Sequence, residues 1–510
     1  MGAACCAGAA LSGGAAAAGP SSMVDGTIWG FLSAIPIAVY HFYPKLTVIL
    51  ATLLVLGAST LYVVLVLLTP VQKQSSPSEL TFLSAASDKP HPLPSFAQDH
   101  EQDQDSINAP VQLSIVIPAY NETERMTTML DEAFAYLQDC KSSGRCLADV
   151  VPDSSSKTTS NGNGNGKAKA NGHVHAKSDG SRSGQSAAAA RVSSALLEPL
   201  VSYEVLIVDD GSKDDTHKLA LDYAKSHPDV SSAVRVVRLT QNRGKGGAVR
   251  HGVLHSRGNV VLFADADGAT RFADLSKLAR RMADIATRSP AGHGIVVGSR
   301  AHMVKSDAVV KRSFVRNLLM HGFHLFLSLL LRPPTLSSLQ RKILGSSSKS
   351  TTQNGSTKTR QLPTQPEIKD TQCGFKLFTR PTAKLVFPYT HIDGWIFDVE
   401  ILILAQTASQ LALSADPSMC PATPQLGCSR DSDDDDNDDL LEGEEKERAK
   451  EEADPLLGLP IPIAEVPVHW VEVGGSKIDL LRDSIRMALD LLVIRFNYAT
   501  GRWKSPPPAL

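Results

Sequence analysis

The chain has 510 residues, of which 53 are Asp or Glu and 51 are Lys or Arg, so its formal net charge at pH 7 is only -2. Seven scattered cysteines show neither a disulfide framework nor zinc-ligand spacing, which excludes a small disulfide-stabilised protein and a zinc finger. Several long stretches contain too few apolar residues to offset the entropy cost of ordering, so the folded part must be much shorter than the chain.

An uncharged run rich in Leu and Val lies near the N-terminus. Residues 46–69 contain no charged side chain, and about 20 apolar residues suffice to cross the hydrocarbon core of a bilayer. A run that begins this far into the chain and is this long is not typical of a cleaved signal peptide. We therefore expect one transmembrane anchor over residues 46–69, after a partly disordered segment at 1–45 and before a linker at 70–110.

Three later segments are rich in Gly, Ser, Asn or acidic residues, and we expect them to be disordered insertions. They cover residues 142–190, 345–366 and 409–454. Long surface loops cost little closure entropy, so these insertions need not disturb the fold around them. The main domain is then expected at residues 111–408, completed by a strand and an amphipathic helix in residues 455–510.

Outside the insertions, short apolar runs alternate with segments of helical periodicity. This alternation predicts βαβ units and a mostly parallel, Rossmann-like α/β sheet with helices on both faces. In such sheets, ligands bind at the carboxyl ends of the strands. The predicted strands are 113–118, 203–208, 234–239 and 260–264, and the predicted helices are 123–137, 214–226 and 245–255.

Polar motifs follow three of the predicted strands, where such a site belongs. They are Pro-Ala-Tyr-Asn-Glu at 118–122, Asp-Asp-Gly-Ser at 209–212 and Asp-Ala-Asp at 265–267. A single Asp-Gly-Ser after a strand would be an ordinary turn and helix cap. Three polar motifs at equivalent positions instead indicate one shared site.

Two of these features suit a phosphorylated ligand. Asp265 and Asp267 lie two residues apart at a strand end, where their carboxylates can converge on Mg²⁺ or Mn²⁺, and such a cation would neutralise a diphosphate leaving group. The sequence Asn-Arg-Gly-Lys-Gly-Gly at 242–247 opens a predicted helix, and its backbone amides and helix dipole suit phosphate. It lacks the spacing of a P-loop, which disfavours ATP or GTP hydrolysis.

In identity and order, these motifs resemble those of glycosyltransferase family 2. Motifs further along the chain resemble the polyprenyl-phosphate branch of that family, and in particular the members that glucosylate dolichyl phosphate. The matching segments are 114–122, 208–212, 242–246 and 265–268 for the family, and 297–300, 370–376 and 394–400 for the branch.

The resemblance implies a GT-A fold and the inverting transfer of glucose from UDP-glucose to dolichyl phosphate, which forms dolichyl β-D-glucosyl phosphate for protein N-glycosylation. It implies Mg²⁺ or Mn²⁺ as cofactor, membrane lipid as a partner and no nucleic acid. The expected location is the endoplasmic reticulum membrane, single-pass, with the catalytic domain facing the cytosol. A glycan on the Asn-Glu-Thr sequon at 121–123 would block the site, which disfavours the lumen.

The resemblance also implies roles for individual residues at the donor. Asp265 and Asp267 are expected to bind the metal, and these two residues with Arg300 and Asp398 are expected to be catalytic. The donor nucleotide sugar would be bound by Pro118, Tyr120, Asn121, Glu122, Asp209, Asp210, Asn242, Gly244, Lys245 and Asp265.

The acceptor phosphate and the sugar have their own candidates. Guanidinium forks match phosphate oxygens, and the candidates for the acceptor phosphate are Arg300, Lys311, Arg312 and Arg316. The alternative for Arg312 and Arg316 is that they flank a membrane-surface helix. The sugar pocket is expected from Asp370, Gly374, Asp393, Trp395 and Glu400, with helix capping as the alternative for any of its carboxylates.

Two other functions share these motifs. A dolichyl-phosphate mannosyltransferase that uses GDP-mannose would have the same catalytic residues, although the N-terminal anchor and Asp-Gly-Trp at 393–395 favour glucose by resemblance. A non-catalytic scaffold that binds nucleotide sugars would be expected to have a damaged Asp-x-Asp or glycine loop, and both are intact.

The segment 479–496 carries Arg482, Arg486 and Asp490 on one stripe, which predicts either an interfacial helix or core packing.

Overall fold

The computed structural model describes residues 43–94, 109–149, 186–305, 368–416, 460–475 and 479–509. The chain divides into two compact units, Met1–Thr69 and Pro70–Leu510. In the first unit, the described residues form helix α2 (Pro44–Leu68). Among the described residues, α2 is the one helix that is long and apolar enough to cross a membrane. Its apolar surface lies on all sides, with Leu54 and Leu67 74% and 78% exposed, as in a membrane span.

The second unit is built around a nine-stranded sheet with the order β2-β1-β5-β4-β3-β6-β8-β7-β9. The central strands β5, β4, β3 and β6 are parallel, whereas β1 and β8 run opposite to their neighbours. The sheet is therefore mixed, and it confirms the expected GT-A-type α/β fold. The strands are β1 (Thr81–Ser84), β2 (Ser87–Pro92), β3 (Val111–Ala119), β4 (Tyr203–Asp209), β5 (Val234–Arg238), β6 (Gly258–Ala264), β7 (Ile295–Ser299), β8 (Phe375–Thr379) and β9 (Ile463–Pro467).

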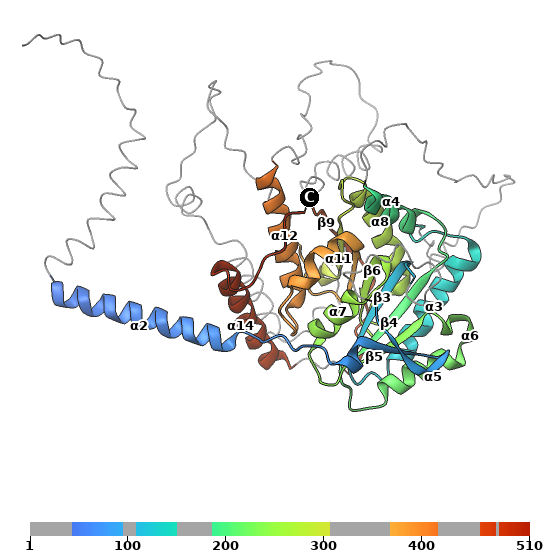
Figure 1. Cartoon of the computed structure of the whole chain (residues 1–510), viewed down its shortest axis with the longest axis horizontal. Coiled ribbons are helices and arrows are strands. Elements are labelled where there is room, and N and C mark those ends of the chain that lie inside the picture. The colour runs from blue at the N-terminus through green and yellow to red at the C-terminus, as the bar shows by residue number, and fades with distance from the viewer. Residues whose placement is uncertain are drawn as a thin grey trace, which may run out of the picture. The chain divides into compact units, whose positions relative to one another are not determined.

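Helices cover both faces of the sheet (Figure 1). Side chains alternate along β3, so Ile115 and Ile117 join a core cluster with residues of α3, α4 and α8. On the opposite face, Val116 and Val208 pack against α7, where a Cβ on Gly252 would lie 2.4 Å from Val116 Cγ1. The helices are α3 (Met126–Ser143), α4 (Ala187–Leu197), α5 (Thr216–Ser226), α6 (Pro228–Ser231), α7 (Lys245–Leu254), α8 (Leu275–Ala286), α11 (Arg380–Val386), α12 (Phe397–Ala415) and α14 (Leu480–Ala499), with short 3₁₀ helices η1 (Pro77–Leu80), η3 (Phe272–Asp274), η4 (Ala301–Lys305) and η6 (Phe387–Tyr389).

The residues expected to form a linker at 70–110 are in part a structured edge of the sheet. Helix η1 and strands β1 and β2 lie within them, and Leu83 on β1 pairs with Val236 on β5. Phe82 is 1% exposed, and the guanidinium of Arg235 lies 4.4 Å from the centroid of its ring. The linker prediction is therefore wrong for residues 77–92, because a short strand with one buried aromatic side chain gives little sequence signal.

Two of the expected insertions are shorter than predicted. Helix α3 continues to Ser143, Cys146 forms a β-bridge with Pro199, and α4 begins at Ala187 behind a Ser186 N-cap. Helix α12 likewise extends to Ala415. Buried small residues explain both extensions, because apolar faces rich in Ala and Ser resemble low-complexity sequence. The insertion at 345–366 lies outside the described residues.

Candidate active site

The polar motifs after β3 and β4 form one hydrogen-bonded unit at the carboxyl edge of the sheet. Asp210 N donates to Ala119 O over 2.8 Å. Asn121 adopts a left-handed backbone with φ of 53° and donates its N–H to Ser212 Oγ over 2.9 Å, while its Oδ1 accepts from Lys213 N over 2.8 Å. The register of the parallel strands thus brings the Pro-Ala-Tyr-Asn-Glu loop and the Asp-Gly-Ser turn together.

The carboxylate of Asp210 holds the glycine-rich loop. Its Oδ1 accepts from Arg243 N over 2.7 Å and its Oδ2 from Gly244 N over 2.8 Å. Burial raises the pKa of Asp210 to about 7, against the effect of these two hydrogen bonds. Gly244 has φ of 95°, and a Cβ there would lie 2.5 Å from Asp393 O. The expectation that the loop amides bind phosphate is therefore wrong for Arg243 and Gly244, whose N–H groups bind Asp210.

Lys245, the first residue of α7, pairs with Asp265 just beyond the end of β6. Its Nζ lies 2.7 Å from Oδ1 and 2.9 Å from Oδ2 of Asp265. Burial opposes the charge of Lys245, but Asp265 and Asp398 outweigh it and raise the pKa of the ammonium. Burial, followed by the charge of Asp265, raises the pKa of Asp267. One cation and several carboxylates thus meet at this strand end.

Asp265 and Asp267 fit a hard divalent cation in their chemistry, since a bound cation would offset the burial and the charge of Asp265 that together raise the pKa of Asp267. Among the described residues, no group of three or more His, Cys, Asp or Glu side chains is arranged to hold a metal ion. Mg²⁺ is usually held by one or two carboxylates together with substrate phosphates and water. The two aspartates therefore match a cation that binds together with a diphosphate.

A second ion pair is buried next to Lys245. Lys376 Nζ on β8 lies 2.8 Å from Asp398 Oδ1 in the first turn of α12, and the two side chains are 1% and 3% exposed. Burial raises the pKa of Asp398, against the charges of Lys376 and Lys245. Asp398 was expected to be catalytic. Its side chain is instead buried against Lys376, and its carboxylate balances the charges of Lys376 and Lys245.

Arg300, directly after β7, is paired with Asp370. The guanidinium Nε lies 2.7 Å from Oδ2 and Nη2 lies 2.9 Å from Oδ1 of Asp370, and Arg300 N donates to Oδ2 over 2.9 Å. Burial alone would raise the pKa of Asp370, but the hydrogen bonds and charge of Arg300 lower it. Arg300 also lies 5.5 Å from the ring centroid of Trp470. To bind an acceptor phosphate, Arg300 must share or release Asp370.

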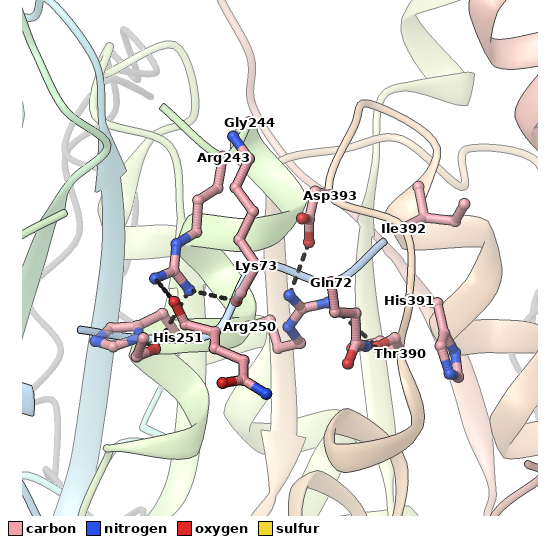
Figure 2. Close-up of polar contacts among 12 residues, drawn as sticks. Gln72, Lys73, Arg243, Gly244, Arg250, His251, Thr390, His391, Ile392 and Asp393 are labelled. Carbon is pink, nitrogen blue, oxygen red and sulfur yellow. Dashed lines mark hydrogen bonds and ion pairs between the residues drawn. The ribbon is translucent and has the colours of Figure 1, made fainter. Parts of the chain in front are cut away.

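The loop at 390–393 lies against α7 (Figure 2). Asp393 Oδ1 pairs with Arg250 Nη2 at 2.8 Å. Glu400 is fully buried, and its carboxylate accepts from His391 N at 2.9 and 3.0 Å and from Ile392 N at 2.8 Å. Glu400 was expected in the sugar pocket, but its oxygens instead hold the backbone of the loop that carries Asp393.

The comparison with known proteins agrees with this geometry. The model of the family described as Glycosyl transferase family 2 matches residues 185–344. The dolichyl-phosphate β-glucosyltransferase of Dictyostelium discoideum is 35% identical over 77% of this chain and 77% of its own length. Those of Saccharomyces cerevisiae and Homo sapiens are 32% and 31% identical, covering 89% and 77% of this chain and 94% and 78% of their own lengths.

The chain belongs to the dolichyl-phosphate β-glucosyltransferase family. It is therefore a glycosyltransferase, and the resemblance read from its motifs is confirmed. The apolar helix α2 is consistent with a membrane anchor in this family member.

Two carboxylates expected at the donor site of this glycosyltransferase support its loops instead. Asp209 is fully buried, and its Oδ1 accepts from Ser212 N over 2.9 Å. Glu122 pairs with Arg125 at 2.7 Å, three residues further along the chain. Asp209 is the last residue of β4 and Asp210 lies just beyond the strand, so these neighbours have different partners.

Some of the other expected site residues lie near Lys245 and Asp265 or in the neighbouring loops, and some lie outside the described residues. A Cβ on Gly374 would lie 1.9 Å from Asp265 Oδ2, so glycine leaves room for that carboxylate. The ring centroid of Trp395 lies 5.6 Å from Lys245 Nζ. Pro118 and Tyr120 lie at the end of β3 and just beyond it, and Asn242 begins the glycine-rich loop. Lys311, Arg312 and Arg316 lie outside the described residues.

Sequence reasoning missed four charged residues around this site. Lys376 had a signal, because a lysine inside the apolar strand 375–379 needs a buried partner. Arg250 lay on a predicted helix without any distinguishing feature. Lys73 and Glu79 fell in the expected linker, where no motif pointed to them.

Proposed function

We propose that this enzyme transfers glucose from UDP-glucose to dolichyl phosphate with inversion and forms dolichyl β-D-glucosyl phosphate for protein N-glycosylation. The observation that carries the proposal is the meeting of Lys245, Asp265 and Asp267 at the carboxyl end of β6. Asp210 follows β4 at the same edge, on the other side of β3. The names of the relatives support the sugar and the acceptor.

The donor is proposed to lie across this edge of the sheet. Asp210 and the loop at 118–122 hold the uridine, while Asp265 contacts the ribose or the sugar. The Lys245 ammonium is a point charge on a flexible stem, so it can exchange Asp265 for a diphosphate oxygen. Asp267, with Asp265, would hold Mg²⁺ or Mn²⁺, which when bound neutralises the charge on the departing UDP.

The acceptor supplies its own nucleophile. A phosphate monoester has a second pKa of about 6, by analogy with phosphorylated side chains, so its oxygen is anionic near neutral pH. That oxygen attacks C1 of glucose opposite the UDP oxygen, the bond from C1 to UDP breaks, and an α-linked donor gives a β-linked product. No strong general base is required, and the burial of Asp398 beside Lys376 accords with this. Catalysis rests on positioning and electrostatic stabilisation.

The lipid acceptor requires a site near the membrane. Arg300, Lys311, Arg312 and Arg316 remain the proposed ligands of its phosphate, and α2 is the proposed single-pass anchor in the endoplasmic reticulum, with the catalytic unit in the cytosol. Protease added to intact microsomes should then degrade the second unit. Full protection of that unit would contradict the topology.

The donor is tested by offering purified full-length protein dolichyl phosphate with labelled UDP-glucose or labelled GDP-mannose. We expect a glucosylated lipid whose linkage is β, and little transfer from GDP-mannose. Preferential transfer of mannose would overturn the sugar assignment. Binding of a nucleotide sugar without transfer from either donor would favour the non-catalytic scaffold.

A further inference from the structure

The segment that joins α2 to β1, residues 70–80, is anchored by one buried carboxylate. We call it the connecting segment. Glu79 is 1% exposed, and its Oε1 accepts from Thr240 N over 2.8 Å and from Thr240 Oγ1 over 2.9 Å. Its Oε2 accepts from Ser76 N over 2.7 Å and pairs with Arg243 Nη2 at 2.5 Å. Glu79 therefore ties the connecting segment to the beginning of the glycine-rich loop.

The guanidinium of Arg243 contacts the connecting segment, and Figure 2 shows it near Lys73. Besides Glu79, its guanidinium donates to Lys73 O over 3.4 Å, Gln74 O over 3.4 Å and Ser75 Oγ over 3.3 Å. The backbone N–H of the same residue donates to Asp210 Oδ1. Arg243 therefore links two parts of the structure. Its side chain binds the connecting segment, and its backbone N–H binds Asp210, the carboxylate that is proposed to hold the uridine.

Gln72 and Lys73 connect this loop to the loop at 390–393. Gln72 Nε2 donates to Thr390 O over 2.5 Å, and Lys73 Nζ donates to Asn242 O over 2.8 Å. Burial raises the pKa of Asp393, and the charges of Arg250, Arg243 and Lys73 oppose that rise. The two loops approach each other at the backbone of Gly244. The connecting segment therefore contacts both loops beside Lys245.

We propose that the connecting segment is a positioning element of the donor site, and that nucleotide affinity depends on Glu79, Lys73 and Gln72 although none of them is in a catalytic motif. The inference rests on the proposed function. Asp210 binds the glycine-rich loop through only two backbone amides. The loop therefore needs a second support to hold its conformation, and the buried Arg243–Glu79 pair supplies it. Removing that support displaces Asp210 together with the loop.

The test uses full-length protein in detergent and measures the dissociation constants of UDP and GDP, the KM for the donor sugar and the KM for dolichyl phosphate. Glu79→Gln should weaken nucleotide binding about tenfold, since small displacements of positioning groups have effects of this size or larger. Gln72→Ala with Lys73→Ala removes only exposed side chains, so this variant keeps its fold, and it should weaken nucleotide binding severalfold.

Matched controls are Glu198→Gln and Lys89→Ala, which change an exposed glutamate and an exposed lysine outside the connecting segment. We expect both controls to bind nucleotide as the natural chain does, and we expect the KM for dolichyl phosphate to be unchanged in all variants. Unchanged nucleotide binding in the Gln72 and Lys73 variant, with or without a lower melting temperature, would overturn this inference and leave the proposed function intact. A natural chain that binds neither nucleotide would overturn the proposed function itself.

Discussion

Lys245 and Asp265 form an ion pair, with Nζ 2.7 Å from Oδ1, at the edge of the sheet where the donor diphosphate is proposed to bind. Their side chains are 19% and 29% exposed, so the pair is partly shielded from water. It neutralises one of the two aspartates of the Asp-Ala-Asp motif. A diphosphate offers Lys245 an anion of higher charge, and its arrival would release Asp265 for the substrate.

Lys245→Gln should lower kcat/KM for the donor by about 10²- to 10³-fold, the range seen when one group that stabilises developing negative charge is removed. The dissociation constant of UDP should rise as well, because the ammonium contacts the diphosphate already in the bound state. Lys89→Gln, an exposed lysine on β2, is the control. A Lys245→Gln enzyme within threefold of the natural rate would exclude the proposed role.

Gly374→Ala tests the space reserved for Asp265. The added Cβ would lie 1.9 Å from Oδ2 and 2.2 Å from Cγ of Asp265, so the carboxylate must move. We expect transfer to fall by about 100-fold with the fold retained, as for other small misplacements of a reacting group. Gly474→Ala, with no atom within 4 Å of its Cβ, should be neutral. Equal rates for the two variants in a transfer assay would contradict the placement of Asp265.

Donor binding should depend on pH through Asp210. Burial raises the pKa of this carboxyl to about 7, so its ionised fraction increases as pH rises from 6 to 8. If the carboxylate accepts a hydrogen bond from uracil, UDP-glucose should bind about tenfold more tightly at pH 8 than at pH 6. Titration calorimetry at both values measures this difference. Asp210→Asn should abolish it, and a pH-independent natural enzyme would speak against a uridine contact.

Acid should destabilise the fold through His293. This histidine is 6% exposed, and burial lowers its pKa from 6.5 to about 4. Between these pH values the unfolded chain binds a proton that the folded chain excludes. The contribution of neutral His293 to the free energy of unfolding is therefore complete above pH 6.5 and is lost as the pH falls. At pH 5 the loss is about 2 kcal/mol. His293→Gln should reduce the stability difference between pH 7 and pH 5 by that amount in denaturant titrations, and an unchanged difference would contradict it.

The sequence predicted the parallel centre of the sheet and the edge where the motifs meet. The strands at 113–118, 203–208 and 260–264 lie within β3, β4 and β6, because strands buried on both faces appear as continuous apolar runs. Strands β7 and β8 were not predicted. β8 is interrupted by the buried Lys376, whose partner Asp398 is supplied by a distant helix, and such a tertiary pairing has no local signature.

The sequence placed the polar motifs at one edge of the sheet, but it did not show what each of their residues contacts. Asp209 and Asp210 are adjacent, and only the packed sheet shows that one closes a turn while the other holds the glycine-rich loop. Asp398 was expected to be catalytic and Glu400 to line the sugar pocket because both lie in a matching motif, yet both side chains are buried. Sequence motifs identify which residues share a site, whereas burial and partners decide what each of them contacts.

The central claim, that Asp265 and Asp267 bind a divalent cation needed for transfer, is tested most directly by chelation. Glucose transfer from labelled UDP-glucose to dolichyl phosphate is measured in one preparation before EDTA, after EDTA, and after Mn²⁺ is added back, for the natural chain and for Asp267→Asn. We predict that EDTA abolishes transfer, that Mn²⁺ restores it, and that Asp267→Asn stays inactive throughout while remaining folded. Undiminished transfer in EDTA, or a normal rate in Asp267→Asn, would contradict the account.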